Sequence, residues 1–323
     1  MFDRLMVGKP IERAATLAKS HLGQRIDKAL AEIWLEFSRA QITNWMRVGA
    51  IRINGEVVKP NVKVCGGEKV RLRAVMSRSE DWLTPEVVDF LVVYEDHDLL
   101  IVDKPKGLVV HPGAGNLSGT LVNGLIERRA ELAQLPRAGI VHRLDKDTTG
   151  LMVVAGNNKA LKMLTRAIAK HEVDRRYVSI CEGILFKQER LEMSIGRDFK
   201  DRTRQRVRAD GRVAVTRVRP IEAFRAHSMV EAFLETGRTH QVRVHLAAIG
   251  HPLVGDRRYG ARGRLPKQPT EELINAIQSF DRQALHAAGL AFMHPSSNER
   301  MEFESKLPSD MRRLIETLRM DRS

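Results

Sequence analysis

The stretch HRLDKDTTG, from His142 to Gly150, is the most informative part of the sequence. It leads directly into the apolar run 151–155, which predicts a buried strand. Asp145 and Asp147 bracket Lys146, so two carboxylates lie just before that strand. Taken alone, an Asp in such a place more often caps a turn than takes part in catalysis. Asp145 is therefore either a turn residue or a catalytic carboxylate, and the rest of the sequence must decide.

Two familiar chemistries do not fit this stretch. A protein-kinase catalytic loop is excluded, because the order is His-Arg-Leu-Asp, no Asp-Phe-Gly follows, and no Gly-rich loop with a strand lysine precedes it. A Mg²⁺ site at Asp145 and Asp147 is disfavoured, because Arg143 and Lys146 would repel the cation. We therefore expect no metal here.

The sequence around this stretch predicts alternating strands and helices. Short apolar runs at 91–94 and 99–102 predict a pair of strands, and 120–129 predicts a helix. Asn157 and Asn158 are candidate N-caps of a further helix, and Arg175-Arg176-Tyr177-Val178 opens another strand. The Gly-rich loop HPGAGN at 111–116 matches neither the P-loop nor the dinucleotide pattern, so no nucleotide cofactor is expected.

Arginine is concentrated in the segment 197–219, which holds nine Lys and Arg residues against three Asp. In a strand, the alternation Arg202, Arg204, Arg206 and Arg208 would place four guanidinium groups on one face. Such a face would repel itself unless it met an anion, although a solvated loop is the simpler alternative. The pattern favours RNA contact, with Arg204 and Arg206 as candidates.

A second dense group of polar residues is GRTHQVRVH at 237–245. Its alternation predicts a strand in which Gln241, Arg243 and His245 face away from a core that contains Val242 and Val244. The histidines of this region lack a metal-binding spacing and any Cys partner, so structural or RNA-contacting roles are expected for them.

Composition indicates a basic globular protein. The 323 residues include 54 Lys and Arg against 40 Asp and Glu, which gives a net charge of +14 and favours partners such as phosphate polymers or anionic membranes. No run of about 18 apolar residues or signal-type segment is present, so we expect a cytoplasmic protein without membrane contact. Cys65 and Cys181 are too few for a disulfide framework and are expected in the core.

Residues 21–76 predict a separate basic module. Helices are expected at 24–35 and 38–48, with Ser38 as N-cap and Gly49 as stop signal. Strands at 51–53 and 56–58 would flank the Asn54-Gly55 turn. The polar segment 77–87 suits a linker, which places the domains at 1–80 and 81–323.

The basic residues of this module suggest an RNA-binding surface. Residues 1–80 hold 15 Lys and Arg against 8 Asp and Glu, half of the net charge of the chain. Elements such as Ser38-Arg39, 49–55 and 66–70 resemble the alpha-L RNA-binding module of ribosomal proteins. The candidate phosphate contacts lie on or beside the two helices: Arg25, Lys28, Arg39 and Arg47.

Several motifs in order resemble the RluA/RluD family of pseudouridine synthases. They are HRLDKDTTG at 142, Arg175-Arg176-Tyr177, GRTHQVRVH at 237 and HPLVGDRRYG at 251. With the front module, the resemblance spans about 22–310 and is closest to the RluD type, which modifies large-subunit ribosomal RNA. The family implies an α+β fold: a catalytic domain with a mixed, mainly antiparallel sheet, preceded by a small α/β RNA-binding module.

The resemblance also assigns roles to single residues. It implies that Asp145 is the catalytic carboxylate, that Tyr177 packs against the target base, and that Arg243 forms an ion pair with the carboxylate. Arg143 would enter the RNA stack where the uridine leaves it, and Arg238 and His240 are further RNA-contact candidates. No cofactor is implied.

These motifs lead us to expect an isomerase that acts on large-subunit ribosomal RNA, free or in an assembling subunit, as a monomer. Two alternatives stay open at this stage. A non-catalytic RNA-binding assembly protein would use Asp145 only as a turn residue, and a glycosidase would release free uracil instead of rejoining it.

Overall fold

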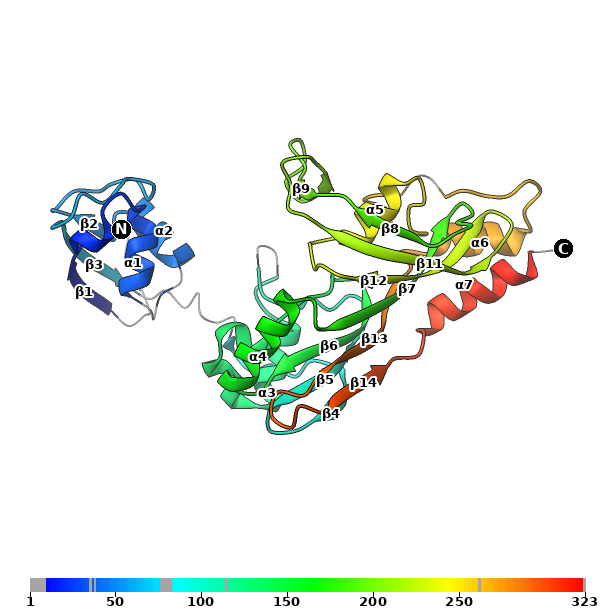
Figure 1. Cartoon of the computed structure of the whole chain (residues 1–323), viewed down its shortest axis with the longest axis horizontal. Helices are drawn as coiled ribbons and strands as arrows, with labels where there is room; N and C mark the ends of the chain where they lie inside the picture. Colours follow the sequence, from blue (N-terminus) through cyan, green and yellow to red (C-terminus); the bar gives the residue numbers. More distant parts are fainter. Residues whose placement is uncertain are drawn as a thin grey trace, which may run out of the picture. The chain divides into compact units, whose positions relative to one another are not determined.

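The computed structural model describes residues 10–34, 37, 39–75, 83–113, 116–260 and 263–321. The chain divides into two compact units, Met1–Asp81 and Trp82–Ser323. Figure 1 shows both units.

The first unit packs two helices on a small antiparallel sheet. The helices are α1 (Ile26–Ile33) and α2 (Arg39–Arg47), preceded by the short 3-10 helix η1 (Lys19–His21). The described strands are β1 (Pro10–Thr16), β2 (Ile51–Ile53) and β3 (Lys69–Val75), in the order β1-β3-β2. Ile26 and Leu30 from α1 meet Ile42 and Met46 from α2 in a core that excludes water.

Most local predictions for this unit are confirmed, but one strand is wrong. Both helices form, and Gly49 follows α2 with a positive φ of 75°. Asn54 and Gly55 form the predicted turn with φ of 51° and 91°. The segment 56–58 is not a strand: it makes a single bridge between Ile53 and Glu56, and β2 pairs with β3 instead. Ser38 and most of the predicted linker lie outside the described residues.

The second unit is built on one large sheet. Its order is β4-β5-β6-β13-β7-β12-β11-β8, with β14 also paired to β13. Only the pair β6–β13 is parallel among the described strands, which confirms the mixed, mainly antiparallel sheet and the α+β class. The strands are β4 (Leu91–Glu95), β5 (Leu99–Lys104), β6 (Thr149–Ala155), β7 (Asp174–Glu182), β8 (Glu189–Glu192), β11 (Val215–Ala223), β12 (His227–Leu234), β13 (Leu285–Met293) and β14 (Arg300–Glu304).

Helices cover both faces of this sheet, so its central strands are buried on both sides. Leu100 and Val102 of β5 pack with α3 (Leu121–Arg128) and α5 (Gln241–Ala248) on one face. Leu99 and Ile101 pack with α4 (Asn158–Ala169) on the other. Farther along that second face lie α6 (Glu271–Ser279) and α7 (Ser309–Met320). The short 3-10 helices η3 (Ala130–Gln134) and η4 (Pro136–Gly139) follow α3.

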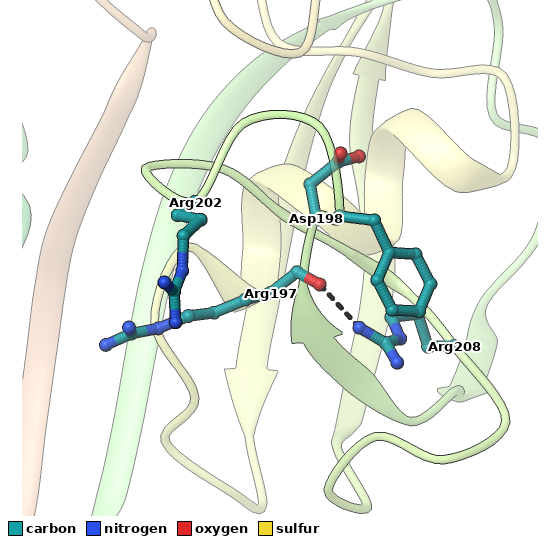
Figure 2. Close-up of a pocket in the computed structure, with 5 residues that line it drawn as sticks. Arg197, Asp198, Arg202 and Arg208 are labelled. Atoms are coloured by element: carbon teal, nitrogen blue, oxygen red, sulfur yellow. Dashed lines mark hydrogen bonds between the residues drawn. The ribbon is translucent and has the colours of Figure 1, made fainter.

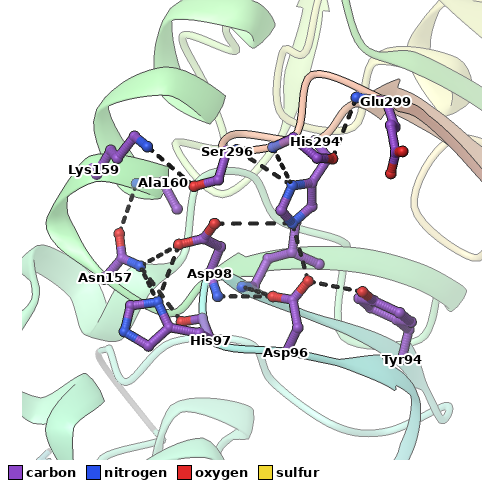
Figure 3. Close-up of polar contacts among 12 residues, drawn as sticks. Tyr94, Asp96, His97, Asp98, Asn157, Lys159, Ala160, His294, Ser296 and Glu299 are labelled. Atoms are coloured by element: carbon purple, nitrogen blue, oxygen red, sulfur yellow. Dashed lines mark hydrogen bonds and ion pairs between the residues drawn. The ribbon is translucent and has the colours of Figure 1, made fainter.

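A polar cluster lies at the β4–β5 turn, beside the start of α4, and is shown in Figure 3. Asn157 caps α4 through a hydrogen bond from the Ala160 amide, as predicted, and its side-chain amide donates to Asp98 at 2.6 Å. The His294 ring lies 3.0 Å from Asp96. Hydrogen bonds from Ser296 and Asn157 lower the pKa of Asp98 to about 2. The cluster joins the β4–β5 turn to α4 and to the β13–β14 turn.

Gly150, the last residue of the HRLDKDTTG stretch, is required where β6 meets β13. It has φ of 111°, and a Cβ there would lie 2.2 Å from the carbonyl oxygen of Ala287. We expect Gly150→Ala to lower the free energy of unfolding by about 2–5 kcal/mol, the sum of backbone strain and overpacking. Urea denaturation measures this loss.

The matched control is Gly250→Ala. Gly250 also has a positive φ of 83°, but a Cβ there meets nothing within 4 Å. We expect this variant to lose only about 1–2 kcal/mol, the cost of the left-handed backbone alone. Equal losses in the two variants would contradict the close packing of β6 on β13.

The two segments with alternating residues do not form long strands. The arginine-rich segment forms a short hairpin of β9 (Ile195–Arg197) and β10 (Gln205–Val207), so only Arg206 of the four alternating arginines lies in a strand. The segment 241–248 is the helix α5, not a strand. Its first six residues are all buried, so the alternation in sequence did not correspond to an inner and an outer face.

The sequence also predicted buried cysteines and no membrane-spanning segment. Cys181 is buried as predicted, but Cys65 is exposed, so its assignment to the core is wrong. Among the described helices, we find none with the length and apolar character that a bilayer crossing requires.

Candidate active site

The loop that carries Asp145 is held from several sides. The Thr148 amide donates to the Asp145 carbonyl at 3.1 Å and closes a turn. The Lys104 ammonium donates to the Lys146 carbonyl at 2.8 Å, and Arg282 donates to the Asp147 carbonyl at 3.1 Å. The contacts come from the end of β5 and the residues before β13, so strands on both sides of β6 position the loop.

Arg243 joins two carboxylates. One guanidinium nitrogen donates to Oδ2 of Asp145 at 2.8 Å. The other two donate to both oxygens of Asp256, at 2.7 and 2.8 Å. A guanidinium held by a bidentate pair has a fixed direction, so Asp256 orients Arg243 toward Asp145. The ion pair that the family resemblance implied is present.

Asp256 is the buried end of this arrangement. Its side chain is fully buried and also accepts hydrogen bonds from the amides of Arg258 and Tyr259. Burial raises the pKa of its carboxyl group, but the hydrogen bonds and charge of Arg243 outweigh burial, and the net shift is downward. The pKa of Arg243 is raised by the two carboxylates despite its burial. The pair is therefore ionised at neutral pH.

Asp145 keeps one oxygen available. Its side chain is 19% exposed, and Arg243 occupies Oδ2. No hydrogen bond reaches Oδ1 within the described part of the chain, and Nε2 of the His240 ring lies 3.8 Å from it. A carboxylate with one oxygen fixed and the other open can act as a nucleophile or a base.

His240 and Tyr259 form a wall beside this carboxylate. Nδ1 of His240 lies 2.6 Å from the Tyr259 hydroxyl, and Arg243 lies over the Tyr259 ring at 5.0 Å. His240 has a left-handed backbone with φ of 57° and immediately precedes α5. Burial lowers the pKa of His240, so the neutral ring is favoured at pH 7. The structure thus places a residue that we predicted to bind RNA close to Asp145.

Tyr177 lies on the same face of the sheet. It is 6% exposed and belongs to the hydrophobic core that includes Val242 and Leu246 of α5. Burial raises the pKa of its hydroxyl to about 12, so it is a neutral phenol. The charge of Asp145 also contributes to that upward shift in pKa.

The remaining predicted RNA contacts lie on exposed or partly exposed surface. Arg143 is exposed, and no partner of its side chain occurs among the described residues. Arg204 lies 5.4 Å from the centre of the Tyr259 ring, and Arg206 is 3.8 Å from Asp198. Arg238 donates to the Val213 carbonyl at 3.0 Å.

In the first unit the predicted contacts divide into two kinds. Arg25 and Arg39 both pair with the buried carboxylate of Asp27, at 3.0 Å each, and keep nearly half of their side chains exposed. Lys28 is 3.7 Å from Glu32, and Arg47 is exposed at the end of α2. Asp27 therefore fixes two guanidinium groups at the surface, which sequence reasoning did not foresee.

Three important site residues were not singled out from sequence. Asp256 and Tyr259 lie in the HPLVGDRRYG motif, where an acidic residue among basic ones was the available signal. Lys104 is fully buried and donates hydrogen bonds to the carbonyls of Pro105, Leu108 and Lys146. In the described ranges no group of three or more His, Cys, Asp or Glu could hold a metal ion.

Comparison with known proteins assigns this arrangement to a family. A model described as RNA pseudouridylate synthase matches residues 98–248, and an S4 domain model matches 24–70. The chain is 46% identical to "Ribosomal large subunit pseudouridine synthase D" of Vibrio parahaemolyticus, over 95% of this chain and 94% of that protein. The Escherichia coli protein of the same name is 45% identical over 96% and 95% of the two chains. This chain belongs to the RNA pseudouridylate synthase family.

Solved structures agree with the fold of this pseudouridine synthase. "Human RNA Pseudouridylate Synthase Domain Containing 4" matches with a TM-score of 0.55 and 24% identity, over 71% of this chain and 92% of that chain. "Human RNA Pseudouridylate Synthase Domain Containing 1" gives 0.53 and 24%, over 72% and 96%. The predicted family, fold class and isomerase activity are confirmed. The S4 match falls on the front module, as the resemblance predicted.

Lys104 makes the stability of this synthase depend on pH. Burial lowers its pKa from 10.5 to about 7, so between these values the unfolded chain holds a proton that the folded chain lacks. The contribution of Lys104 to the free energy of unfolding therefore rises as the pH increases from about 7 to 10.5, and it is smallest at the low end of that range. Relative to Lys104→Met, we expect wild type to gain about 2 kcal/mol in unfolding free energy from pH 7 to 9.

The measurement is urea denaturation of both proteins at several pH values. Taking the difference between them removes the titration of other groups, provided that these are unchanged. A pH-independent difference between the two proteins would contradict the assignment of a depressed pKa to Lys104.

Proposed function

We propose that this chain isomerises uridines of large-subunit ribosomal RNA to pseudouridine, with Asp145 as the catalytic carboxylate. The single observation that carries the residue assignment is the geometry of Asp145: Arg243 holds Oδ2 at 2.8 Å, and no described donor occupies Oδ1. The proposed substrate is supported by the names of the relatives, which match this chain over nearly its whole length.

The reaction fits a single carboxylate. Isomerisation breaks the bond between C1′ of ribose and N1 of uracil, forms a bond from C1′ to C5, and moves the C5 proton to solvent while N1 gains one. Atoms and electrons balance without an oxidant or an external nucleophile. Oδ1 of Asp145 can attack the sugar or the base, or remove a proton from the sugar. Arg243 stabilises the carboxylate through the ion pair at Oδ2, beside the hydrophobic core that contains Tyr177 and Val242.

Extrusion of the target base from the RNA stack would involve Tyr177 and Arg143. A uridine must leave its stack to reach Asp145, which costs a few kcal/mol of unstacking. We assign Tyr177 to packing against the extruded base and the exposed Arg143 to the gap left in the RNA. His240, close to Asp145, and Arg238 would contact the target nucleotide or its neighbours.

We assign residues 1–80 to an RNA-binding module and 81–323 to the catalytic domain. The proposal is supported by the division of the chain near residue 81 and by the positions of the two family matches. Arg25, Lys28, Arg39 and Arg47 would contact phosphates, and Arg204 and Arg206 would extend the contact surface of the second domain. We further propose a cytoplasmic monomer that acts on free RNA or an assembling large subunit.

The test is to map pseudouridine across the large-subunit ribosomal RNA of a strain that lacks this gene. We expect specific positions to revert to uridine, and to regain pseudouridine when wild-type protein is supplied. An unchanged map would refute the substrate assignment. A protein that binds the RNA and assists assembly, but leaves every position unmodified, would identify the non-catalytic alternative.

A further inference from the structure

A pocket in the β9–β10 hairpin lies outside the catalytic site. It has a volume of about 370 Å³ and is lined by Arg197, Asp198, Phe199, Arg202 and Arg208 (Figure 2). That volume lies within the range of pockets that hold small organic groups. Three arginines, one aspartate and one phenylalanine therefore line a space large enough for part of a ligand.

The charges of this pocket are not balanced from within. Asp198 Oδ1 accepts hydrogen bonds from the amides of Lys200 and Asp201, and Figure 2 shows its carboxylate pointing away from Arg197 and Arg202. Among the described residues, neither Arg197 nor Arg202 has a carboxylate partner. Two neighbouring guanidinium groups without a counter-charge repel each other, so an anion such as a phosphate would stabilise the pair.

Phe199 adds an aromatic surface to this cationic pocket. Its side chain is 74% exposed, an unusual position for a large apolar ring. The Arg208 guanidinium lies 3.7 Å from the ring centre, and Arg208 is itself held by Asp210 and by the Arg197 carbonyl. One face of the ring is thus supported by a fixed cation. An exposed, supported aromatic ring beside free guanidinium groups is typical of surfaces that stack an unpaired base.

The hairpin is also anchored to the residues around Asp145. The Gln205 amide donates to the Tyr259 hydroxyl at 2.8 Å, and that hydroxyl lies 2.6 Å from Nδ1 of His240. Arg258 donates to the Thr203 carbonyl at 2.6 Å. A nucleotide held in the pocket would therefore be bound at a fixed position relative to the catalytic carboxylate.

We propose that this pocket binds one unpaired nucleotide of the RNA substrate, distinct from the uridine that is isomerised. The base stacks on Phe199, and the phosphate pairs with Arg197 and Arg202. This inference rests on the proposed function, because it takes RNA as the substrate. It deepens that function by requiring a second extruded or single-stranded nucleotide near each target.

The test compares Phe199→Leu with Phe186→Leu in the full-length protein. Phe186 is also strongly exposed, at 87%, but lies between β7 and β8, outside the pocket. With a transcript of the large-subunit ribosomal RNA, we expect Phe199→Leu to raise Kd about tenfold, the typical effect of losing one stacked base. Phe186→Leu should bind as wild type does. Equal binding by the two variants would overturn the proposal.

A second comparison separates base stacking from general phosphate attraction. On a fully paired RNA duplex, Phe199→Leu should bind as tightly as wild type, since a duplex offers no unpaired base. The double change of Arg197 and Arg202 to Gln should reduce the salt dependence of transcript binding by one to two ions. The matched control changes Arg312 and Arg313 on α7, both exposed, to Gln. Equal losses on duplex and transcript, or equal salt slopes in both double variants, would also overturn the proposal.

These outcomes are distinguishable from a failure of the proposed function. If wild type forms pseudouridine while Phe199→Leu binds the transcript normally, only the pocket is refuted. If wild type forms no pseudouridine but Phe199→Leu loses affinity, the isomerase is refuted and the nucleotide pocket stands.

Discussion

Asp145→Asn is expected to abolish turnover while the protein folds and binds RNA nearly as wild type does. The substitution keeps the shape of the side chain, which is part exposed, and removes the charge that Arg243 pairs at 2.8 Å. An amide is neither a nucleophile nor a base at neutral pH, so the rate should fall by more than about 10⁴-fold. Release of tritium from RNA labelled at C5 of uridine measures this rate in a single turnover.

Two controls accompany the Asp145→Asn variant. The Kd for the transcript should stay within about threefold of wild type, and the urea midpoint should shift only slightly, since Asp145 is not buried like Asp256. Asp147→Asn is the matched variant, because Asp147 contacts Arg282 through its backbone carbonyl and not through its carboxylate. An Asp145→Asn protein that retains a rate near wild type would remove Asp145 from the chemistry.

Arg243→Leu is expected to reduce both stability and catalysis, for separate reasons. The change leaves Asp256 as a fully buried carboxylate without its cation, which costs about 3–5 kcal/mol of unfolding free energy. It also removes the one hydrogen-bond donor to the Asp145 carboxylate among the described residues, so kcat should fall by about 10²–10³-fold. Affinity for the transcript should change much less, because Arg243 is buried and acts as a positioning residue.

A double variant separates the two effects of Arg243. Replacing Asp256 with Asn in the Arg243→Leu background removes the buried unpaired charge, so most of the lost stability should return. Catalysis should stay low, because Asp145 is still unpositioned. Recovery of both stability and kcat would show that Arg243 serves the fold alone, and a loss confined to Kd would assign it to phosphate contact.

The motif HRLDKDTTG and the family resemblance predicted the main pair of this site. Asp145 and Arg243 are 98 positions apart in the sequence, and their pairing was expected only from the family resemblance. In the structure, a guanidinium nitrogen of Arg243 lies 2.8 Å from Oδ2 of Asp145. Asp256 was within a quoted motif but had no assigned role. Its function depends on the bidentate contact with Arg243, which sequence spacing does not reveal.

Local patterns failed where tertiary contacts determine the conformation. The segment 241–246 alternates polar and apolar residues, yet it is helical, because Gln241 and His245 satisfy their polar groups inside the core through Thr216. The alternating arginines would share one face only in a strand, but Asp198 and Asp201 accept hydrogen bonds from loop amides and turn the chain before β10. Alternation in sequence therefore did not predict the conformation of either segment.

The most direct test of the central claim is nucleoside analysis of a large-subunit ribosomal RNA transcript after a single turnover with purified, metal-depleted wild-type protein. The account predicts pseudouridine in amounts up to that of the enzyme, at specific positions, with no free uracil. Uridine that stays unchanged would contradict the isomerase, and free uracil would show that the enzyme cleaves the glycosidic bond without rejoining it.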